Sequence, residues 1–221
     1  MPAMTLITDQ LVLGISLLFF PRPWMQKAVT LLRGRRRKSG VERLRDPWKN
    51  ARRPGDAAVR FGTEFSKVRN YLDLVRGAVG SLAIWGGLGH PAAIGGSGFR
   101  ALGIKFLISL VAVGIQAARF RGRRVSFFPP VFFLGGLVFG VCGWQTAAFA
   151  FVLTWAMHAM IPSAGWFLTL NAVVVLGFGA FFQDIRNPTV AMTAGLIWFP
   201  VLLSLLTNRP LVIYQSRGGD K

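Results

Sequence analysis

From Gly77 to Leu206 the chain is built mainly from long apolar runs, and this pattern constrains the fold more than any other feature of the sequence. The runs cover residues 75–90, 101–118, 130–158, 166–183 and 189–206. About 20 apolar residues allow an α-helix to cross the hydrocarbon core of a bilayer, where a helix also satisfies its own backbone hydrogen bonds. The sequence therefore predicts an all-α, polytopic membrane bundle with about five spans.

The charged residues are segregated along the chain. Residues 21–76 contain 16 Lys or Arg against five Asp or Glu, whereas ten basic and two acidic residues follow Gly77. The whole chain has a net charge of +18 although 52% of its 221 residues are hydrophobic, which is too apolar for a soluble globular protein. We predict a basic interfacial region at 1–76, a membrane bundle at 77–206 and a polar tail at 207–221.

The N-terminal region is predicted to hold two kinds of helix. The apolar run from Leu11 to Phe20 is short for a span, so we expect a re-entrant or interfacial helix, with a full span as the alternative. Further on, an amphipathic helix is predicted to continue into the span at 75–90. Its apolar face would carry Phe61, Phe65, Val68, Leu72, Val75 and Val79, and its polar face Arg60, Glu64, Lys67, Asn70 and Asp73.

Basic side chains next to membrane spans favour anionic lipid as a partner, with an acidic protein as the alternative and nucleic acid less favoured. Each Lys or Arg near negative headgroups contributes roughly 1 kcal/mol, and an indole anchors at the interface. The predicted lipid-binding residues are Trp24, Arg33, Arg35, Arg36, Arg37, Lys38, Arg119, Arg121, Arg123 and Arg124. Because positive loops stay inside, we expect an inner (cell) membrane protein with its basic region in the cytosol. With five spans, the Pro162 turn and the C-terminal tail would lie outside.

No carboxylate lies within the spans after Gly77, and the chain has no HExxH, GxSxG or P-loop motif. Proton relays and metal-assisted hydrolysis in membranes need acidic groups or clustered histidines. Cys142 is the single cysteine, which excludes an intramolecular disulfide. We therefore expect a non-enzymatic protein without a metal site.

A ridge of small residues recurs along residues 130–158. It consists of Gly136, Gly140, Gly143, Ala147, Ala150 and Thr154, at spacings of four and three. Small side chains let helix backbones approach closely in lipid. This small-residue seam predicts helix packing, either inside the bundle or between subunits. Our leading interpretation is a structural or accessory subunit of an oligomeric membrane assembly.

His158 follows the seam one turn after Thr154. A small residue four positions before a membrane histidine resembles the tetrapyrrole-ligating pattern of light-harvesting polypeptides, over about five residues and with Thr154 in place of the usual alanine. The resemblance implies a haem- or chlorophyll-type pigment at His158 as an alternative function, with His90 near the same face. Without a pigment, the imidazole would be satisfied by backbone or water.

Four polar residues are predicted to be embedded in the membrane, namely Lys105, Gln116, Gln145 and Asn171. Basic residues in a pore favour anions, so a passive channel or carrier for an anionic solute is a further alternative. In a protein without a pore, Lys105 would snorkel to the surface and the amides would bridge helices.

Overall fold

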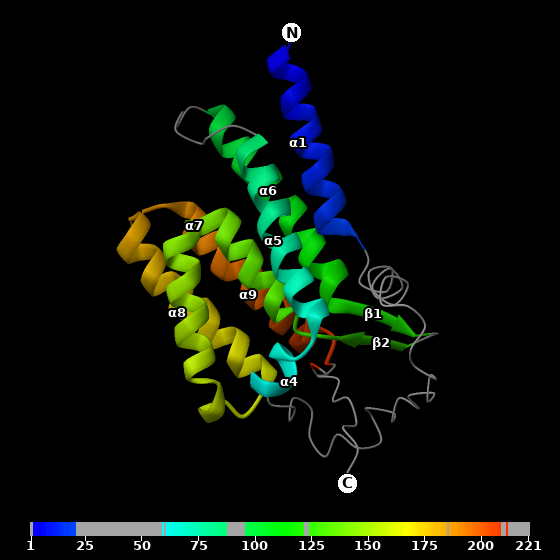
Figure 1. Cartoon of the computed structure of the whole chain (residues 1–221), viewed down its shortest axis with the longest axis vertical. Coiled ribbons are helices and arrows are strands. Elements are labelled where there is room, and N and C mark those ends of the chain that lie inside the picture. The colour runs from blue at the N-terminus through cyan, green and yellow to red at the C-terminus, as the bar shows by residue number, and fades with distance from the viewer. Residues whose placement is uncertain are drawn as a thin grey trace.

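The computed structural model describes residues 2–20, 59, 61–87, 96–121, 124–184, 186–208 and 211. Its helices are α1 (Pro2–Phe19), α4 (Phe61–Phe65), α5 (Val68–Gly87), α6 (Gly96–Ala117), α7 (Val131–Ala156), α8 (Ala164–Gln183) and α9 (Pro188–Leu206), with a 3-10 turn η1 (His158–Met160). Figure 1 shows them as one helical bundle. The predicted helical membrane class is confirmed.

Within the described residues, four helices are long and apolar enough to cross a membrane when only length and composition are counted, in the segments 100–117, 131–156, 164–183 and 188–206; a bend in α7 divides the second of them into two arms. They match four of the five predicted spans closely. The fifth, 75–90, lies in α5, which carries Arg69, Asp73 and Arg76 in its first half. Because of these charges, α5 is less apolar than the four candidate spans. α1 has only a short apolar stretch, Asp9–Phe19.

A short antiparallel hairpin, which the sequence did not predict, follows α6. β1 (Ala118–Arg121) pairs with β2 (Arg124–Phe127), and the register joins Ala118 to Phe127. The backbone N–H of Phe128 also donates to the Ala117 carbonyl at 2.8 Å. The hairpin therefore continues directly from the last turn of α6.

The amphipathic helix differs from the prediction in two ways. Ser66 and Lys67 interrupt it between α4 and α5. The part of its predicted apolar face that lies in α5 points outward, with Val75 57% exposed, while Asn70, Asp73 and Arg76 are buried. In water this arrangement would be unfavourable, but in a bilayer apolar side chains face lipid and ionisable ones face the bundle interior. α5 thus directs apolar side chains outward and a polar face toward the bundle interior.

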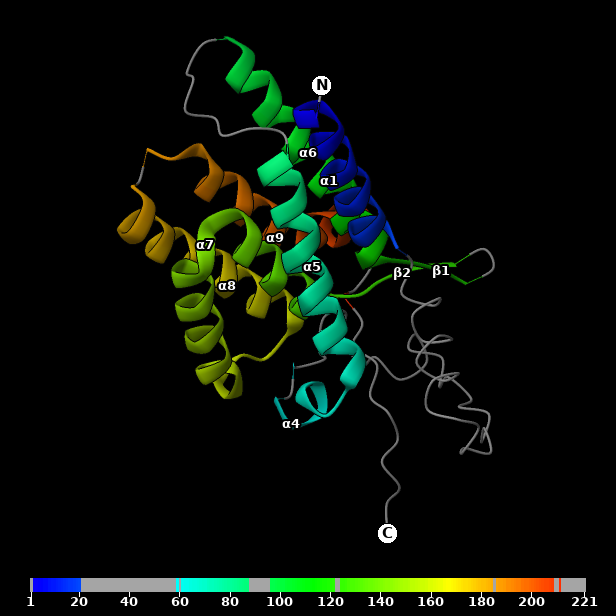
Figure 2. The same ribbon diagram turned by 45° about the horizontal axis from the view of Figure 1, so that its top comes forward.

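α7 is not the single straight span that the sequence predicts. Gly143 interrupts it with φ 76° and ψ 166°, a conformation essentially restricted to glycine. The rings of Phe132 and Trp155 lie 5.6 Å apart, although a straight helix would separate the two residues by about 35 Å. α7 therefore folds back on itself, and Figures 1 and 2 show the bend between its two arms. Each arm has roughly 12 residues, which is too short to cross a bilayer alone.

The fold-back of α7 places the ends of several segments at one end of the bundle. Phe61 of α4 contacts Trp155 at 5.8 Å, and Phe65 contacts Phe132 at 5.1 Å. Leu211 forms a backbone bridge with Phe127, and its side chain lies near Gly165. We call this the basic end, because the sequence segments at 21–60, 119–124 and 209–221 all connect to the bundle there.

This arrangement corrects the predicted topology. The Pro162 turn and the start of the tail, at Leu211, lie at the basic end rather than opposite it. The turn from Asp184 to Pro188 lies at the other end, since Gln183 hydrogen-bonds to the Cys142 carbonyl at the bend of α7. The prediction counted α7 as one crossing, whereas a helical hairpin returns to the end where it began.

Candidate functional site

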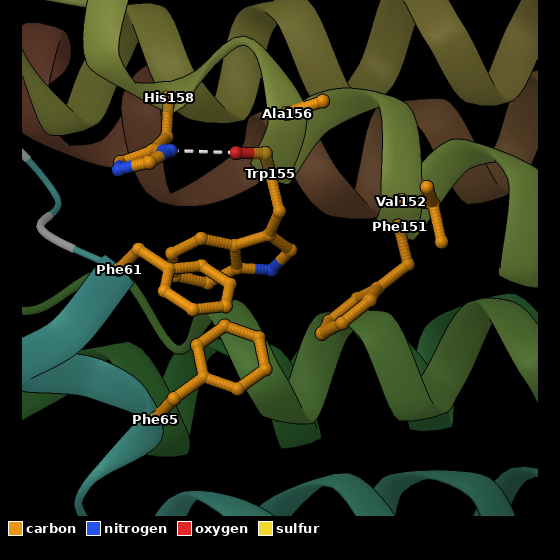
Figure 3. Close-up of a pocket in the computed structure, with 7 residues that line it drawn as sticks. All are labelled: Phe61, Phe65, Phe151, Val152, Trp155, Ala156 and His158. Atoms are coloured by element: carbon orange, nitrogen blue, oxygen red, sulfur yellow. Dashed lines mark hydrogen bonds between the residues drawn. The ribbon is translucent and has the colours of Figure 1, made fainter.

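An apolar cavity of about 500 Å³ opens at the basic end, between α4 and the second arm of α7. Figure 3 shows its lining residues, which are Phe61, Phe65, Phe151, Val152, Trp155, Ala156 and His158. The volume lies within the range of roughly 300 to 1,000 Å³ that is typical of small-molecule sites. The imidazole of His158 is the one ionisable group in this lining, and the indole Nε1 of Trp155 is a second polar group, without a hydrogen-bond partner in the described part of the chain.

Aromatic packing builds the walls of the cavity. The ring of Phe65 stacks on that of Phe61 at 4.1 Å and meets Trp155 edge to face at 4.8 Å. Trp155 is 4% exposed and also contacts Phe167 of α8 at 5.0 Å. Such offset and edge-to-face contacts add roughly 0.5 to 1.5 kcal/mol to the burial of each pair. The walls are therefore held in place from three helices.

His158 is oriented by the backbone. Its Nδ1 lies 2.6 Å from the Trp155 carbonyl oxygen, and Figure 3 shows the other ring nitrogen pointing away from that contact. The imidazole ring also lies 5.7 Å from the ring of Phe61. A carbonyl can only accept, so Nδ1 carries the proton and Nε2 keeps a lone pair in the neutral ring. Nε2 can thus accept a hydrogen bond or ligate a metal.

A second polar cluster joins α1, α5 and α6. The guanidinium of Arg76 donates to Asp73 Oδ1 and to Gln116 Oε1, both at 2.9 Å, and also to the Phe20 carbonyl. Gln116 donates from Nε2 to the Leu18 carbonyl at 3.0 Å. These groups are almost fully buried. Because carbonyls at a helix C-terminus carry partial negative charge, the cation also stabilises the end of α1.

The predicted small-residue seam divides between two sets of contacts. A side chain at Gly136 would collide with the Leu74 carbonyl of α5, and one at Gly140 with Ser81. Ala147, Ala150 and Thr154 are buried on the second arm of α7, where Thr154 Oγ1 hydrogen-bonds to Asn171 of α8 at 3.2 Å. Gly143 forms the bend. Most of the seam is thus occupied within the chain, and an intersubunit role for it stays a prediction.

The four predicted pore residues lie in separate places. Lys105 is buried and does not snorkel, because Nζ donates to the Trp85 carbonyl at 3.0 Å and lies 5.4 Å from the Trp85 ring centroid. Gln116 and Asn171 bridge helices as described above. Gln145 is exposed at the bend of α7. The structure brings none of these residues together around a common path.

The remaining predicted site residues are the lipid-binding candidates and His90. Trp24, Arg33, Arg35, Arg36, Arg37, Lys38, His90 and Arg123 lie outside the described residues. The backbones of Arg119, Arg121 and Arg124 lie in the hairpin at the basic end. Their predicted contacts with lipid are therefore not tested by the structure.

Sequence reasoning missed the cavity and the buried ion pair. The spacing of Phe151, Trp155 and His158 at four and three residues places them on one helical face, and this signal was available in the sequence. The contribution of Phe61 and Phe65 was not, because it depends on how α4 packs against a folded-back α7. The sequence pattern placed Asp73 on the polar face of the amphipathic helix, whereas the structure buries it in an ion pair with Arg76.

The fold defines a class, that of multi-pass helical membrane proteins. Comparison of the chain with protein families, characterised proteins and solved structures finds no match for any of the three.

Proposed function

We propose that this chain is a non-enzymatic membrane protein whose basic end binds anionic lipid headgroups. The observation that supports the proposal is the shared position of Phe20, Phe61, the hairpin and Leu211 at one end of the bundle. The sequence segments that connect there hold 20 of the 26 basic residues, at 21–60, 119–124 and 209–221. Positive charge concentrated at one membrane surface attracts negative headgroups.

The proposal also assigns an orientation. Positive residues close to the ends of spans stay in the cytosol, so the basic end faces the cytosolic leaflet of the inner membrane. Arg100 and Arg186 are the basic residues that the described structure exposes toward the other end. The charge asymmetry is larger than in the five-span scheme, because the C-terminal tail now adds its charges to the cytosolic side.

Of the rival functions, the anion channel has less support, since its candidate residues do not share a path. Assembly with other subunits stays a prediction. A partner would need surfaces other than the occupied seam, such as the exposed faces of α6 and α8 that carry Leu107 and Val173.

Replacement of Arg35, Arg36, Arg37 and Lys38 by glutamine tests lipid binding. We expect phosphatidylglycerol to raise the melting temperature of the purified protein more than phosphatidylcholine does, and the fourfold variant to lose much of that gain. Four charges at about 1 kcal/mol each give an upper limit of about 4 kcal/mol, reduced by salt. Arg100→Gln with Arg186→Gln is the control at the other end. An undiminished, salt-independent gain in the fourfold variant would refute the proposal.

Single-cysteine labelling tests the orientation. Ser39→Cys and Ser216→Cys should resist a membrane-impermeant maleimide in intact cells and react after lysis, because both segments join the basic end. Arg186→Cys, in an exposed turn at the other end, should react in intact cells. The native Cys142 is buried and provides the background signal. Labelling of Ser216→Cys in intact cells, with Ser39→Cys protected, would restore the five-span scheme.

A further inference from the structure

The aromatic cavity is placed to receive a molecule from the lipid phase. Val152 and Ala156 line it and are exposed, Val152 at 66%. They belong to the second arm of α7, whose outer surface also carries the exposed Phe149. An apolar arm of this kind faces lipid tails in a membrane. A ligand that enters between these residues must therefore be soluble in lipid.

His158 offers a hydrogen-bond acceptor to a ligand in the cavity. The Trp155 carbonyl fixes the proton of His158 on Nδ1, so Nε2 is an acceptor when the ring is neutral. Within the described part of the chain, no side chain or backbone group donates to Nε2. A hydroxyl on the ligand would donate the hydrogen bond that Nε2 can accept.

The walls favour a ring over a flexible chain. Phe61, Phe65, Phe151 and Trp155 line the open cavity, and Phe65 and Trp155 already meet edge to face. A further aromatic ring gains the same offset or edge-to-face contacts, whereas an acyl chain gains only burial. The ligand thus combines an aromatic ring with a hydroxyl group.

We propose that this cavity binds a lipid-soluble phenol or hydroquinol. Phe61, Phe65 and Trp155 contact one another, so the ligand's ring packs on the side of this aromatic cluster that faces the cavity, and its hydroxyl donates to His158 Nε2. The inference is independent of the proposed binding of anionic lipid, which concerns other residues and charge rather than aromatic contacts. It also replaces the pigment expected from the sequence resemblance by a smaller ligand that donates a hydrogen bond.

Trimethylhydroquinone and its dimethyl ether form a matched pair of probes, because the ether keeps the ring and cannot donate. Binding to the purified full chain in detergent is measured by equilibrium dialysis under anaerobic conditions. We expect saturable binding of the hydroquinone and about three- to tenfold weaker binding of the ether, which is the range for one hydrogen bond. Equal affinity for both probes, or no binding of either, would overturn the proposal.

Two kinds of variant locate the site. His158→Phe keeps a ring but removes the acceptor, so it should bind both probes equally, whereas His158→Gln keeps an acceptor and should retain part of the preference. Val152→Trp fills the cavity from an exposed position and should abolish binding even if the histidine variants fail to fold. Val173→Trp on the exposed face of α8 is its control. Unchanged binding in Val152→Trp contradicts the proposed site.

Added haemin tests the competing ligand. A Soret band that depends on His158 in the wild-type protein, together with displacement of hydroquinone, would assign the site to a metal tetrapyrrole and overturn the proposal. If haemin gives no Soret band that depends on His158, the result supports the phenol or hydroquinol as the ligand. The phosphatidylglycerol experiment is unaffected by either result, so failure of one proposal does not imply failure of the other.

Discussion

The two halves of the bundle are held together by different chemistry. In the first half, Arg76, Asp73 and Gln116 connect α5 and α6 to the last carbonyls of α1 through charged or amide hydrogen bonds. In the second half, α7, α8 and α9 meet through aromatic rings and isolated pairs, such as Thr154 with Asn171 and Cys142 with Thr193 at 3.3 Å. In the first half, a few charged or amide hydrogen bonds hold the helices together. In the second half, many weaker contacts share this role.

The comparison shows how a membrane bundle can be stabilised without a hydrophobic driving force between helices. Lipid tails are as apolar as leucine, so association depends on close packing and on hydrogen bonds between helices. α5 uses both. Its Gly77 faces the Phe133 carbonyl of α7, and its Gly80 faces Gly14 of α1, while Asp73 and Arg76 occupy the same inner side. α5 therefore links the two halves, and most of its substitutions should be costly.

Asp73→Ala should have the largest effect, since it removes the carboxylate that forms an ion pair with the buried Arg76. Removing one partner of a buried ion pair costs about 3 to 5 kcal/mol of folding free energy. Glu64→Gln is the control, because the Lys67–Glu64 pair is partly exposed and such pairs contribute about 1 kcal/mol at most. Reversible unfolding in mixed detergent micelles measures both. A loss in Asp73→Ala no larger than in Glu64→Gln would show that the first half does not depend on its ion pair.

Gly136→Ala should have an intermediate effect at the contact between the halves. The new methyl group would overlap the Leu74 carbonyl and lie 2.8 Å from the Ala78 nitrogen, both of which are backbone atoms that cannot rotate away. Overpacking of this kind costs about 1 to 3 kcal/mol. Gly177→Ala in α8 is the matched control, with no atom within 4 Å of the added carbon. The same unfolding assay applies. Equal stability of the two variants would contradict the close α5–α7 crossing.

The sequence predicted some elements of the fold well and others poorly for identifiable reasons. The boundaries of α8 and α9 agree with prediction within a few residues, because Ser163 and Asn187 cap them and hydropathy changes sharply there. The bend at Gly143 was not predicted. Glycine at this position also fitted a regular small-residue seam, and a straight and a broken helix have the same hydropathy. Gln183, which satisfies the Cys142 carbonyl freed by the bend, is 41 residues away.

The candidate site shows the same division. His158 was identifiable as a membrane histidine, and its neighbours Trp155 and Phe151 share its helical face. The opposite wall comes from α4, which the sequence assigned to a continuous amphipathic helix. A cavity exists only because α4 separates from α5 at Ser66 and packs against the returning arm of α7.

The sequence by itself determined that this protein is a helical membrane protein with segregated positive charge, because hydropathy and charge are properties of each segment in its solvent. The tertiary structure decided which face of α5 is buried, where α7 turns back and which chain ends meet. Those outcomes depend on contacts between segments far apart in the chain, such as Arg76 with Phe20 and Phe127 with Leu211. A fold-back at a single glycine changes the end of the bundle at which every later turn lies. Local sequence patterns do not reveal such a change.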